Sequence, residues 1–249
     1  MNPDSITVKL AAELAGYTTH NIRRLARTGV LKADRFGTAW AIDRTSLLDH
    51  IAENKRLGQG KHAANRYTKD LGMIQKLDLT EALVLDTETT GLGNMDQIVE
   101  IAIIDMTGNL ILQSLLNPTI AMTQRAYEVH RIGPSELDAA PLFPTIWPEL
   151  IRVLNGKKVI AYNANFDMRM IAQTAHAFDL DLTLLDCDFH CAMRAYAMYR
   201  GGRRNYKLTT ACAAMSVTGL PEGMQPHRAQ ADAELTRQLV LKMLETPAD

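Results

Sequence analysis

The sequence predicts a small helical unit followed by a larger α/β domain in which helices flank a mixed sheet, and three observations support this division. The hydrophobic period changes near residue 79, from short helical patterns to strand-like runs. Beyond that point, three consecutive strand-like runs precede strands that alternate with helices, an order typical of a mixed sheet covered by helices. The charge also changes sign, because residues 1–69 carry a net charge of +6 and the remaining residues carry −7.

The composition narrows the class of protein. The chain has 249 residues, of which 47% are hydrophobic, so a sizeable core can form. No apolar run reaches the roughly 18 residues of a membrane helix, and the N-terminus lacks the pattern of a signal peptide. We therefore expect a soluble, cytoplasmic protein. Its three cysteines form an odd and sparse set, which argues against a disulfide framework.

Residues 1–55 predict a compact helical module. Thr7 is expected to cap a first helix that ends at Gly16, and Thr19 a second helix that ends at Gly29. Two short helices joined by a tight turn form a helix-turn-helix pattern. The outer face of the second helix is basic and carries Arg23, Arg24 and Arg27.

The following residues complete this module. Apolar residues alternate around Phe36-Gly37-Thr38, which predicts a β-hairpin, and Ser46 is expected to cap a third helix. Residues 5–52 resemble the excisionase-type winged helix-turn-helix family, close to the DNA-binding domain of MerR-type regulators. The resemblance implies that the module targets duplex DNA through the arginines of its second helix. The alternative is that it binds a protein or packs on the larger domain. Residues 56–78 are polar and basic and are predicted to be a linker.

From residue 79 to residue 249 the patterns predict one α/β domain. Strands are expected at residues 81–88, 96–106, 110–117, 158–163 and 182–186. Helices are expected at residues 148–156, 165–178, 191–199, 208–216 and 229–244.

The first strand of this domain carries a pair of acidic residues. Asp86 and Glu88 lie two apart, so both carboxylates should point to one face of the sheet. Two carboxylates this close repel each other unless a cation lies between them, and hard oxygen ligands suit Mg²⁺ or Mn²⁺. Taken alone, this acidic pair indicates the surface end of a strand more strongly than it indicates a metal site.

Two further motifs place an acid near the start of a helix. Asn163 is expected to end the fourth strand and Asn165 to cap the next helix, which puts Asp167 in the first turn, where the helix dipole by itself favours an aspartate. Asp232 should lie inside the last helix and His227 on the loop before it, because on one helix the two side chains would point about 140° apart. A loop histidine can accept a proton near neutral pH, although most are simply solvated.

In this order, the motifs D-x-E, N-x-x-x-D and H-x-x-x-x-D resemble those of the DEDDh 3′→5′ exonucleases. The segments LDTETTGL, EVHRIGPSEL and YKLTTACAAM also resemble segments of that family. The resemblance covers about residues 80–246 and implies a ribonuclease-H-like fold. Arg131 departs from the family pattern, which has glycine there. Arg228 stands where the sister subgroup has tyrosine, so the histidine subgroup fits better.

The resemblance also implies a chemistry and a set of site residues. Four carboxylates would hold two Mg²⁺ or Mn²⁺ ions, and His227 would act as general base in the hydrolysis of DNA from its 3′ end to nucleoside 5′-monophosphates. The implied metal ligands are Asp86, Glu88, Asp167 and Asp232. The implied substrate-binding residues are Thr89, Thr90, Gly91, Leu92, His130 and Asn163.

Two other hypotheses about function stay open at this point. One is that the substrate is RNA, and the other is that the chain is a DNA-binding regulator with an inert nuclease-like domain. The presence of all five expected catalytic side chains argues against the second. Association with a DNA polymerase is also left open by the resemblance. The basic run Arg200–Lys207 is either a contact to the substrate or a solvated surface.

Overall fold

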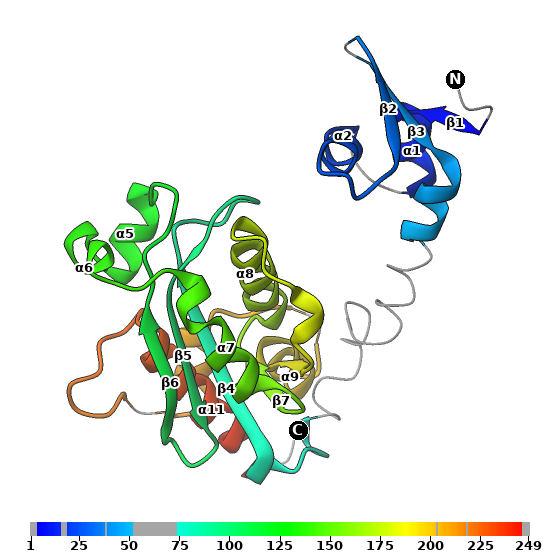
Figure 1. Cartoon of the computed structure of the whole chain (residues 1–249). Coiled ribbons are helices and arrows are strands. Elements are labelled where there is room, and N and C mark those ends of the chain that lie inside the picture. The colour runs from blue at the N-terminus through cyan, green and yellow to red at the C-terminus, as the bar shows by residue number, and fades with distance from the viewer. Residues whose placement is uncertain are drawn as a thin grey trace. The chain divides into compact units, whose positions relative to one another are not determined.

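The computed structural model describes residues 4–15, 19–37, 39–51, 74–202, 204–217 and 219–245. The chain divides into two compact units, Met1–His62 and Ala63–Asp249 (Figure 1). Most of the predicted linker at residues 56–78 lies outside the described residues. None of the described helices is both long enough and apolar enough to cross a membrane.

The N-terminal unit combines short helices with a three-stranded antiparallel sheet. Its elements are β1 (Ser5–Thr7), α1 (Val8–Ala15), α2 (Thr19–Arg27), β2 (Ala33–Phe36), β3 (Ala39–Asp43) and a helix over residues 44–51. The strand order is β1-β3-β2, and Ile22, Ile42 and Leu47 meet in one core. The hairpin of β2 and β3 confirms the predicted one, although Thr38 at its tip and Gly16 after α1 lie outside the described residues.

The predicted capping residue is confirmed for one helix of this unit and is wrong for another. Oγ1 of Thr7 accepts a hydrogen bond from the N–H of Leu10 (3.2 Å), which confirms the predicted cap of α1. The third helix begins at residue 44, two residues before the predicted cap at Ser46. Oδ1 of Asp43 accepts the N–H of Ser46 (2.7 Å), so Asp43 is the capping residue. The Ser46 hydroxyl instead accepts the N–H of Lys32 (3.0 Å).

The second unit is built on a five-stranded mixed sheet. Its strands are β4 (Ala82–Thr89), β5 (Ile98–Asp105), β6 (Leu110–Leu115), β7 (Lys158–Ala161) and β8 (Asp188–Cys191). Their order is β6-β5-β4-β7-β8, with β4, β5 and β6 antiparallel and β7 and β8 parallel to β4. The predicted mixed sheet is confirmed, and β4 lies at its centre.

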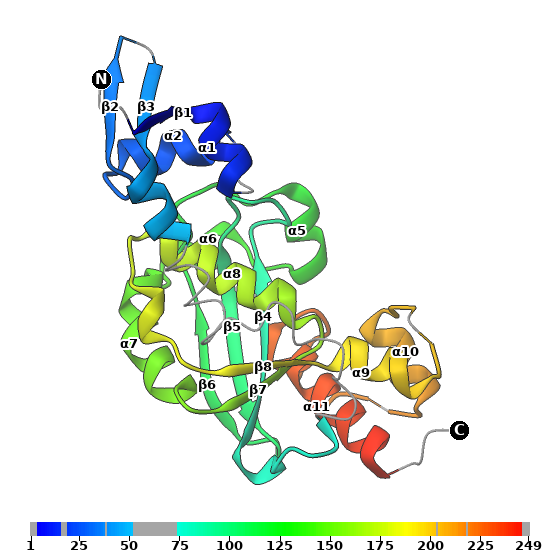
Figure 2. The same cartoon turned by 90° about the vertical axis from the view of Figure 1, so that its right-hand side faces the viewer.

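Helices cover both faces of this sheet, as Figures 1 and 2 show. They are α5 (Gln124–His130), α6 (Pro134–Asp138), α7 (Phe143–Leu154), α8 (Ala164–Ala177), α9 (Ala192–Tyr199), α10 (Leu208–Ala214) and α11 (Ala229–Glu245). Leu83 and Leu85 of β4 pack against α7 and α8, whereas Val84 packs in the core formed with α9, α10 and α11. The alternation along β4 therefore separates two cores, one on each face.

One predicted strand is wrong, and another ends earlier than predicted. The apolar run at residues 182–186 is not a strand: Leu182–Leu184 is a short 3-10 helix, because the Asp181 side chain accepts the N–H of Thr183 (2.9 Å) and turns the chain. The fifth strand is β8, a few residues later. In addition, β7 ends at Ala161 and not at Asn163. Helices α5 and α6 were not predicted.

Candidate active site

Three acidic side chains converge near the C-terminal end of β4. Asp86, Glu88 and Asp232 each offer a carboxylate oxygen, and these oxygens lie within 4.8 Å of one another. Asp86 and Glu88 alternate with Thr87, so they point to the face of the sheet that α11 covers. Asp232 lies in the first turn of α11. The prediction that Asp86 and Glu88 share one face is confirmed, and the last aspartate meets them there.

Asp167 reaches this region from α8, on the other face of the sheet. Its side chain is buried, and Oδ1 accepts a hydrogen bond of 2.8 Å from Oγ1 of Thr87. Asp167 is outside the group of three mutually close carboxylates, yet its charge is near enough to raise the pKa of Asp86. The structure therefore places the fourth predicted acid at the edge of the cluster.

The start of α8 differs from the prediction. Asn163, not Asn165, caps this helix, because β7 is shorter than its apolar run suggested and the N–H of Phe166 already donates to the Asn163 carbonyl (2.7 Å). The Asn163 side chain makes no capping hydrogen bond, and the residue is exposed. Asp167 still lies in the first turn of the helix, as predicted.

Burial makes all four carboxyl groups difficult to ionise, and mutual repulsion adds to this effect at Asp86 and Glu88. Burial raises the pKa of Asp86 well above its ordinary value, and the charges of Asp167 and Glu88 raise it further. Burial and then repulsion from Asp232 raise the pKa of Glu88 to about 9. Burial raises the pKa of Asp167 to about 7, against the opposing hydrogen bond from Thr87, and it also raises the pKa of Asp232. Hard divalent cations relieve such repulsion, so this donor set fits Mg²⁺ or Mn²⁺.

His227 lies beside the cluster on the loop that precedes α11, as the spacing predicted. Its backbone is in the left-handed region, with φ of 58°, and its side chain is half exposed. The ring nitrogen Nδ1 is 3.9 Å from Oδ2 of Asp232, and the backbone N–H donates to Oδ1 of the same residue (3.4 Å). The histidine is thus next to the carboxylates and accessible from solvent.

The loop after β4 satisfies its polar groups internally. Oγ1 of Thr90 donates to Oδ1 of Asp96 (2.7 Å), and the N–H of Gly93 donates to Oδ2 (2.5 Å). Oγ1 of Thr89 donates to the carbonyl of Gly91 (2.8 Å). A Cβ at Gly91 would lie 2.8 Å from the Asp96 carboxylate, so a larger residue here would push that carboxylate away from its hydrogen-bond donors. The side chains of Thr89 and Thr90, expected to bind substrate, hold the loop in shape.

A groove of about 450 Å³ begins at the cluster and runs along this loop and α5. Glu88 lines the groove, and Leu92, Val129 and Phe166 supply apolar side chains. Leu92 is 71% exposed, so the loop presents this side chain outward. Of the predicted substrate-binding residues, Thr89, Gly91 and Leu92 therefore line an open groove beside the acids.

His130 lines the same groove but is buried, with both ring nitrogens engaged. Nδ1 accepts the N–H of Ile132 (3.1 Å), and Nε2 lies 3.3 Å from the carbonyl of Thr89. Burial lowers the pKa of His130, so the neutral ring with a proton on Nε2 fits both contacts. Arg131 follows with φ of 58°, in the left-handed region where glycine is most easily accommodated.

The residues that fix the loop to α8 were not among the predicted site residues. Nη1 of Arg169 and Nε2 of Gln173 donate to the carbonyl of Gly93 (3.0 and 3.1 Å), and Nε2 of Gln173 also donates to the carbonyl of Asp96 (2.6 Å). The helix that carries Asp167 therefore also positions Leu92. The spacing of Arg169 and Gln173 on one helix face was visible in the sequence, but nothing in it indicated partners almost 80 residues away.

The fold of this unit is ribonuclease-H-like, and its acidic cluster lies at the central strand of the sheet. A family model described as exonuclease matches residues 83–240, which is more than half of the chain. The chain belongs to this exonuclease family, of the DEDDh type, and the match does not extend to the N-terminal unit.

Relatives of the nuclease domain come from phage and bacteria. An uncharacterised exonuclease, CP81, of Escherichia phage 186 is 34% identical over 163 residues, which cover 63% of this chain and 84% of the relative. The DNA polymerase III subunit epsilon of Rickettsia conorii is 29% identical over 65% of this chain and 73% of its own length. The structure of exonuclease X in complex with 5′ overhanging duplex DNA superposes with a TM-score of 0.53 at 24% identity, covering 66% of this chain and 91% of that one.

Proposed function

We propose that this chain is a metal-dependent 3′→5′ exonuclease that releases nucleoside 5′-monophosphates from DNA. The observation that carries the proposal is the convergence of Asp86, Glu88 and Asp232 within 4.8 Å beside an open groove. The similarity to a DNA polymerase III subunit favours DNA as the substrate. The 3′→5′ direction rests on the resemblance to DEDDh enzymes.

Each part of the site has a role in this proposal. The residues that would hold two Mg²⁺ or Mn²⁺ ions are Asp86, Glu88, Asp167 and Asp232. When bound, the ions would supply activation of the nucleophile and neutralise charge at the phosphodiester. A ring nitrogen of His227 accepts the proton of the attacking water, since this side chain is half exposed and lies next to Asp232.

The groove orients the end of the strand. The terminal base contacts the apolar side chains of Leu92, Val129 and Phe166, while its phosphate faces Glu88 and its neighbours. Gly91 lets the loop close on the Asp96 carboxylate, and in this shape the loop presents Leu92 to the groove. His130 acts through the loop, since its contact is with the Thr89 carbonyl.

Degradation assays test the proposal directly. Single-stranded DNA labelled at its 5′ end should shorten stepwise with Mg²⁺ and stay intact with a chelator, whereas a 3′-terminal label should appear at once as mononucleotide. Asp232→Asn is the inactive control. Intact DNA under these conditions, with folded protein and bound metal, would favour the inert regulator. Faster shortening of RNA of the same sequence would replace DNA with RNA as the substrate.

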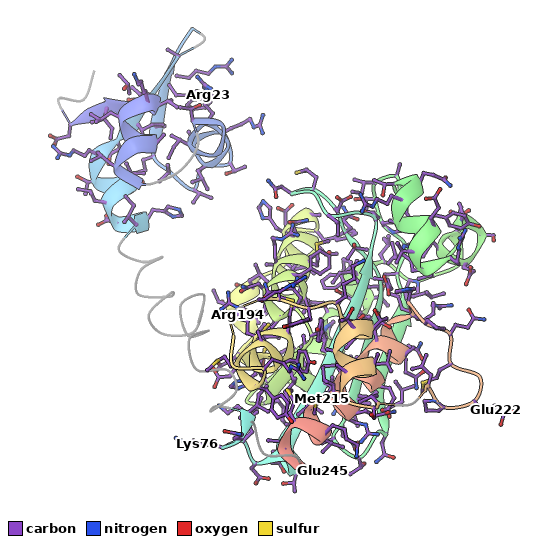
Figure 3. All side chains as sticks on the ribbon, turned by 180° about the vertical axis from the view of Figure 1, so that it is seen from behind. Arg23, Lys76, Arg194, Met215, Glu222 and Glu245 are labelled. Atoms are coloured by element: carbon purple, nitrogen blue, oxygen red, sulfur yellow. The ribbon has the colours of Figure 1, made fainter. Side chains whose placement is uncertain are left out.

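For the N-terminal unit we propose a role in targeting duplex DNA. Arg23 and Arg27 are exposed on α2, Arg24 lies on the same helix, and Arg23 can be located in Figure 3. Arginines on one helix suit contacts to phosphates. The full chain with Arg23→Gln and Arg24→Gln should bind duplex DNA more weakly and with a salt slope lower by about 1 for each lost phosphate contact. Lys9→Gln on α1 is the matched control, and unchanged duplex binding by the double variant would contradict this role.

A further inference from the structure

Glu100 is a buried carboxylate in the middle of β5, opposite the acidic cluster. In the antiparallel register of β4 and β5 it pairs with Glu88, and its side chain is 1% exposed. Nε and Nη2 of Arg228 donate to its two oxygens (2.9 and 3.0 Å). The N–H of Ala229 (3.0 Å) and Nε2 of Gln113 (3.1 Å) also donate to it. Glu100 therefore binds the first residue of α11 and the side chain before it.

Arg228 connects the two site residues of this segment. It follows His227 directly, and its carbonyl accepts the N–H of Asp232 (3.0 Å). Its side chain is 27% exposed and reaches back to β5 in a two-pronged contact with Glu100. A guanidinium held by both oxygens of a carboxylate is fixed in direction as well as in distance.

The segment before Arg228 is more exposed. Residues 221–223 and 225–227 are exposed, and Figure 3 shows Glu222 at the outer bend of this loop. His227 ends the exposed stretch, with φ of 58°. Arg228 is thus the point at which the chain returns from the loop to the sheet, one residue after the histidine.

We propose that the Arg228–Glu100 pair positions His227 for proton transfer. The inference rests on the proposed function, because it assigns a support to the residue proposed as general base. Arg228 is a positioning residue that acts through the backbone of its neighbour. The same contact allows a second role for Arg228, which is to balance the charge of Glu100 beside the acidic cluster. The two roles predict different outcomes when the charges of both Arg228 and Glu100 are removed.

A mutant cycle separates positioning from charge balance. His227→Ala should lower kcat by about 10²- to 10⁴-fold, and Arg228→Gln by about 10- to 100-fold through misplacement of the base, with KM unchanged. In the His227→Ala background, Arg228→Gln should add no more than about a twofold further loss, since the base it positions is gone. Arg228→Lys should recover part of the activity, because lysine keeps the charge but not the two-pronged contact.

The double variant Glu100→Gln with Arg228→Gln, called the neutral pair, leaves no unpaired buried carboxylate. It can therefore be tested even if Arg228→Gln alone does not fold. Positioning predicts that this double variant stays as slow as Arg228→Gln, whereas charge balance predicts recovery to the wild-type rate. Arg152→Gln, an exposed arginine of α7, is the matched control for the loss of one positive charge.

Nuclear magnetic resonance of the histidine rings provides a readout without turnover. The His227 signal is the one lost in His227→Ala, and in Arg228→Gln or the neutral pair it should sharpen and move toward the position of a mobile histidine. Any of three results overturns the positioning role. They are an unchanged His227 signal, a loss of kcat from Arg228→Gln that is as large in the His227→Ala background as in the wild type, and recovery of kcat in the neutral pair. Full activity of His227→Ala, in contrast, refutes the proposed role of His227 as the base and with it this inference.

Discussion

Glu88 and Asp96 lie eight residues apart in the chain, yet one belongs to the acidic cluster and the other to the loop beside it. Burial and repulsion raise the pKa of Glu88 to about 9. Asp96 accepts hydrogen bonds from the Thr90 hydroxyl and the Gly93 N–H within its own loop. The folded protein does little to stabilise a negative charge on Glu88, whereas it gives Asp96 hydrogen-bond donors. This difference distinguishes an acid whose surroundings suit a cation from an acid that shapes the backbone.

The largest effect should come from removing one charge of the cluster. Asp232→Asn keeps the size of the side chain but loses a metal ligand, so kcat on single-stranded DNA with Mg²⁺ should fall by about a thousandfold or more, equivalent to about 4 kcal/mol. The thermal midpoint of the metal-free variant should be equal to or above that of the wild type, because one repelling charge is gone.

A matched variant controls for loss of an acid elsewhere. Glu149→Gln neutralises an exposed acid on α7 and should leave turnover unchanged. If Asp232→Asn binds metal and degrades DNA at the normal rate, the cluster is not the reactive site, and the contrast with Asp96 has no functional meaning.

The next effect concerns the loop. Asp96→Ala leaves the Thr90 hydroxyl and the Gly93 N–H without their acceptor, which should cost about 2 kcal/mol of unfolding free energy. Because the loop presents Leu92 to the groove, KM for DNA should rise more than kcat falls. Steady-state kinetics and urea unfolding measure the two parts.

Asn94→Ala, in the same loop and exposed, is the control for that experiment. A drop in kcat at constant KM for Asp96→Ala would place Asp96 with the reactive acids and would remove the distinction drawn above.

A smaller effect is expected from the pH dependence of the metal-free protein. The pKa of Glu88 in the folded protein, about 9, lies above its ordinary value of 4.5. The folded state therefore keeps a proton that the unfolded chain releases above pH 4.5, so stability decreases as pH rises from 4.5 to 9. Glu88→Gln removes this contribution, so the wild type should lose about 1 kcal/mol more stability than the variant, or about 2–4 °C more in Tm, for each pH unit between pH 5 and pH 8.

Addition of Mg²⁺ sharpens the same test. It should raise the Tm of the wild type at pH 8 more than that of Glu88→Gln, because the ion relieves repulsion that the variant has already lost. Equal Tm values at pH 5 and pH 8 for both metal-free proteins would show that Glu88 is ionised without penalty.

The sequence was sufficient for the parts of the site that depend on local geometry. The common face of Asp86 and Glu88 follows from the period of two in a strand, and the loop position of His227 follows from its spacing to Asp232. The mixed character of the sheet also followed from the order of strands and helices along the chain. For the two side-chain placements, the information lies within a few neighbouring residues.

The rest depends on contacts between distant segments. Arg169 bonds to a carbonyl 76 residues away, and Arg228 to a carboxylate 128 residues away, so no local pattern contains either pair. The prediction of a strand at residues 182–186 was wrong because a short apolar run fits either a strand or a helical turn. The hydrogen bond to the Asp181 side chain selects the turn. The sequence therefore predicted the acids of the cluster better than the residues that support them.

The smallest change in stability should come from substitution of Arg131, which follows His130, the residue that contacts the loop through the Thr89 carbonyl. Its φ of 58° is unfavourable for a residue with a Cβ, so Arg131→Gly removes strain of about 1 kcal/mol. The substitution also loses the contact of the guanidinium with the Tyr127 ring (5.9 Å), which at an exposed site contributes about 0.5 kcal/mol, and it gains freedom in the unfolded chain. The net change in unfolding free energy should lie within about 0.5 kcal/mol of zero.

Arg131→Asn and Arg131→Val separate these contributions. Asparagine tolerates the left-handed region and should resemble glycine, whereas valine keeps the strain, adds a branched Cβ and should destabilise by about 1–2 kcal/mol. Urea unfolding of the three variants measures the series, with KM for DNA as a second readout of the loop. If valine is tolerated as well as glycine, the backbone at Arg131 relaxes out of the left-handed region, and the support of the loop through His130 is weaker than its hydrogen bonds indicate.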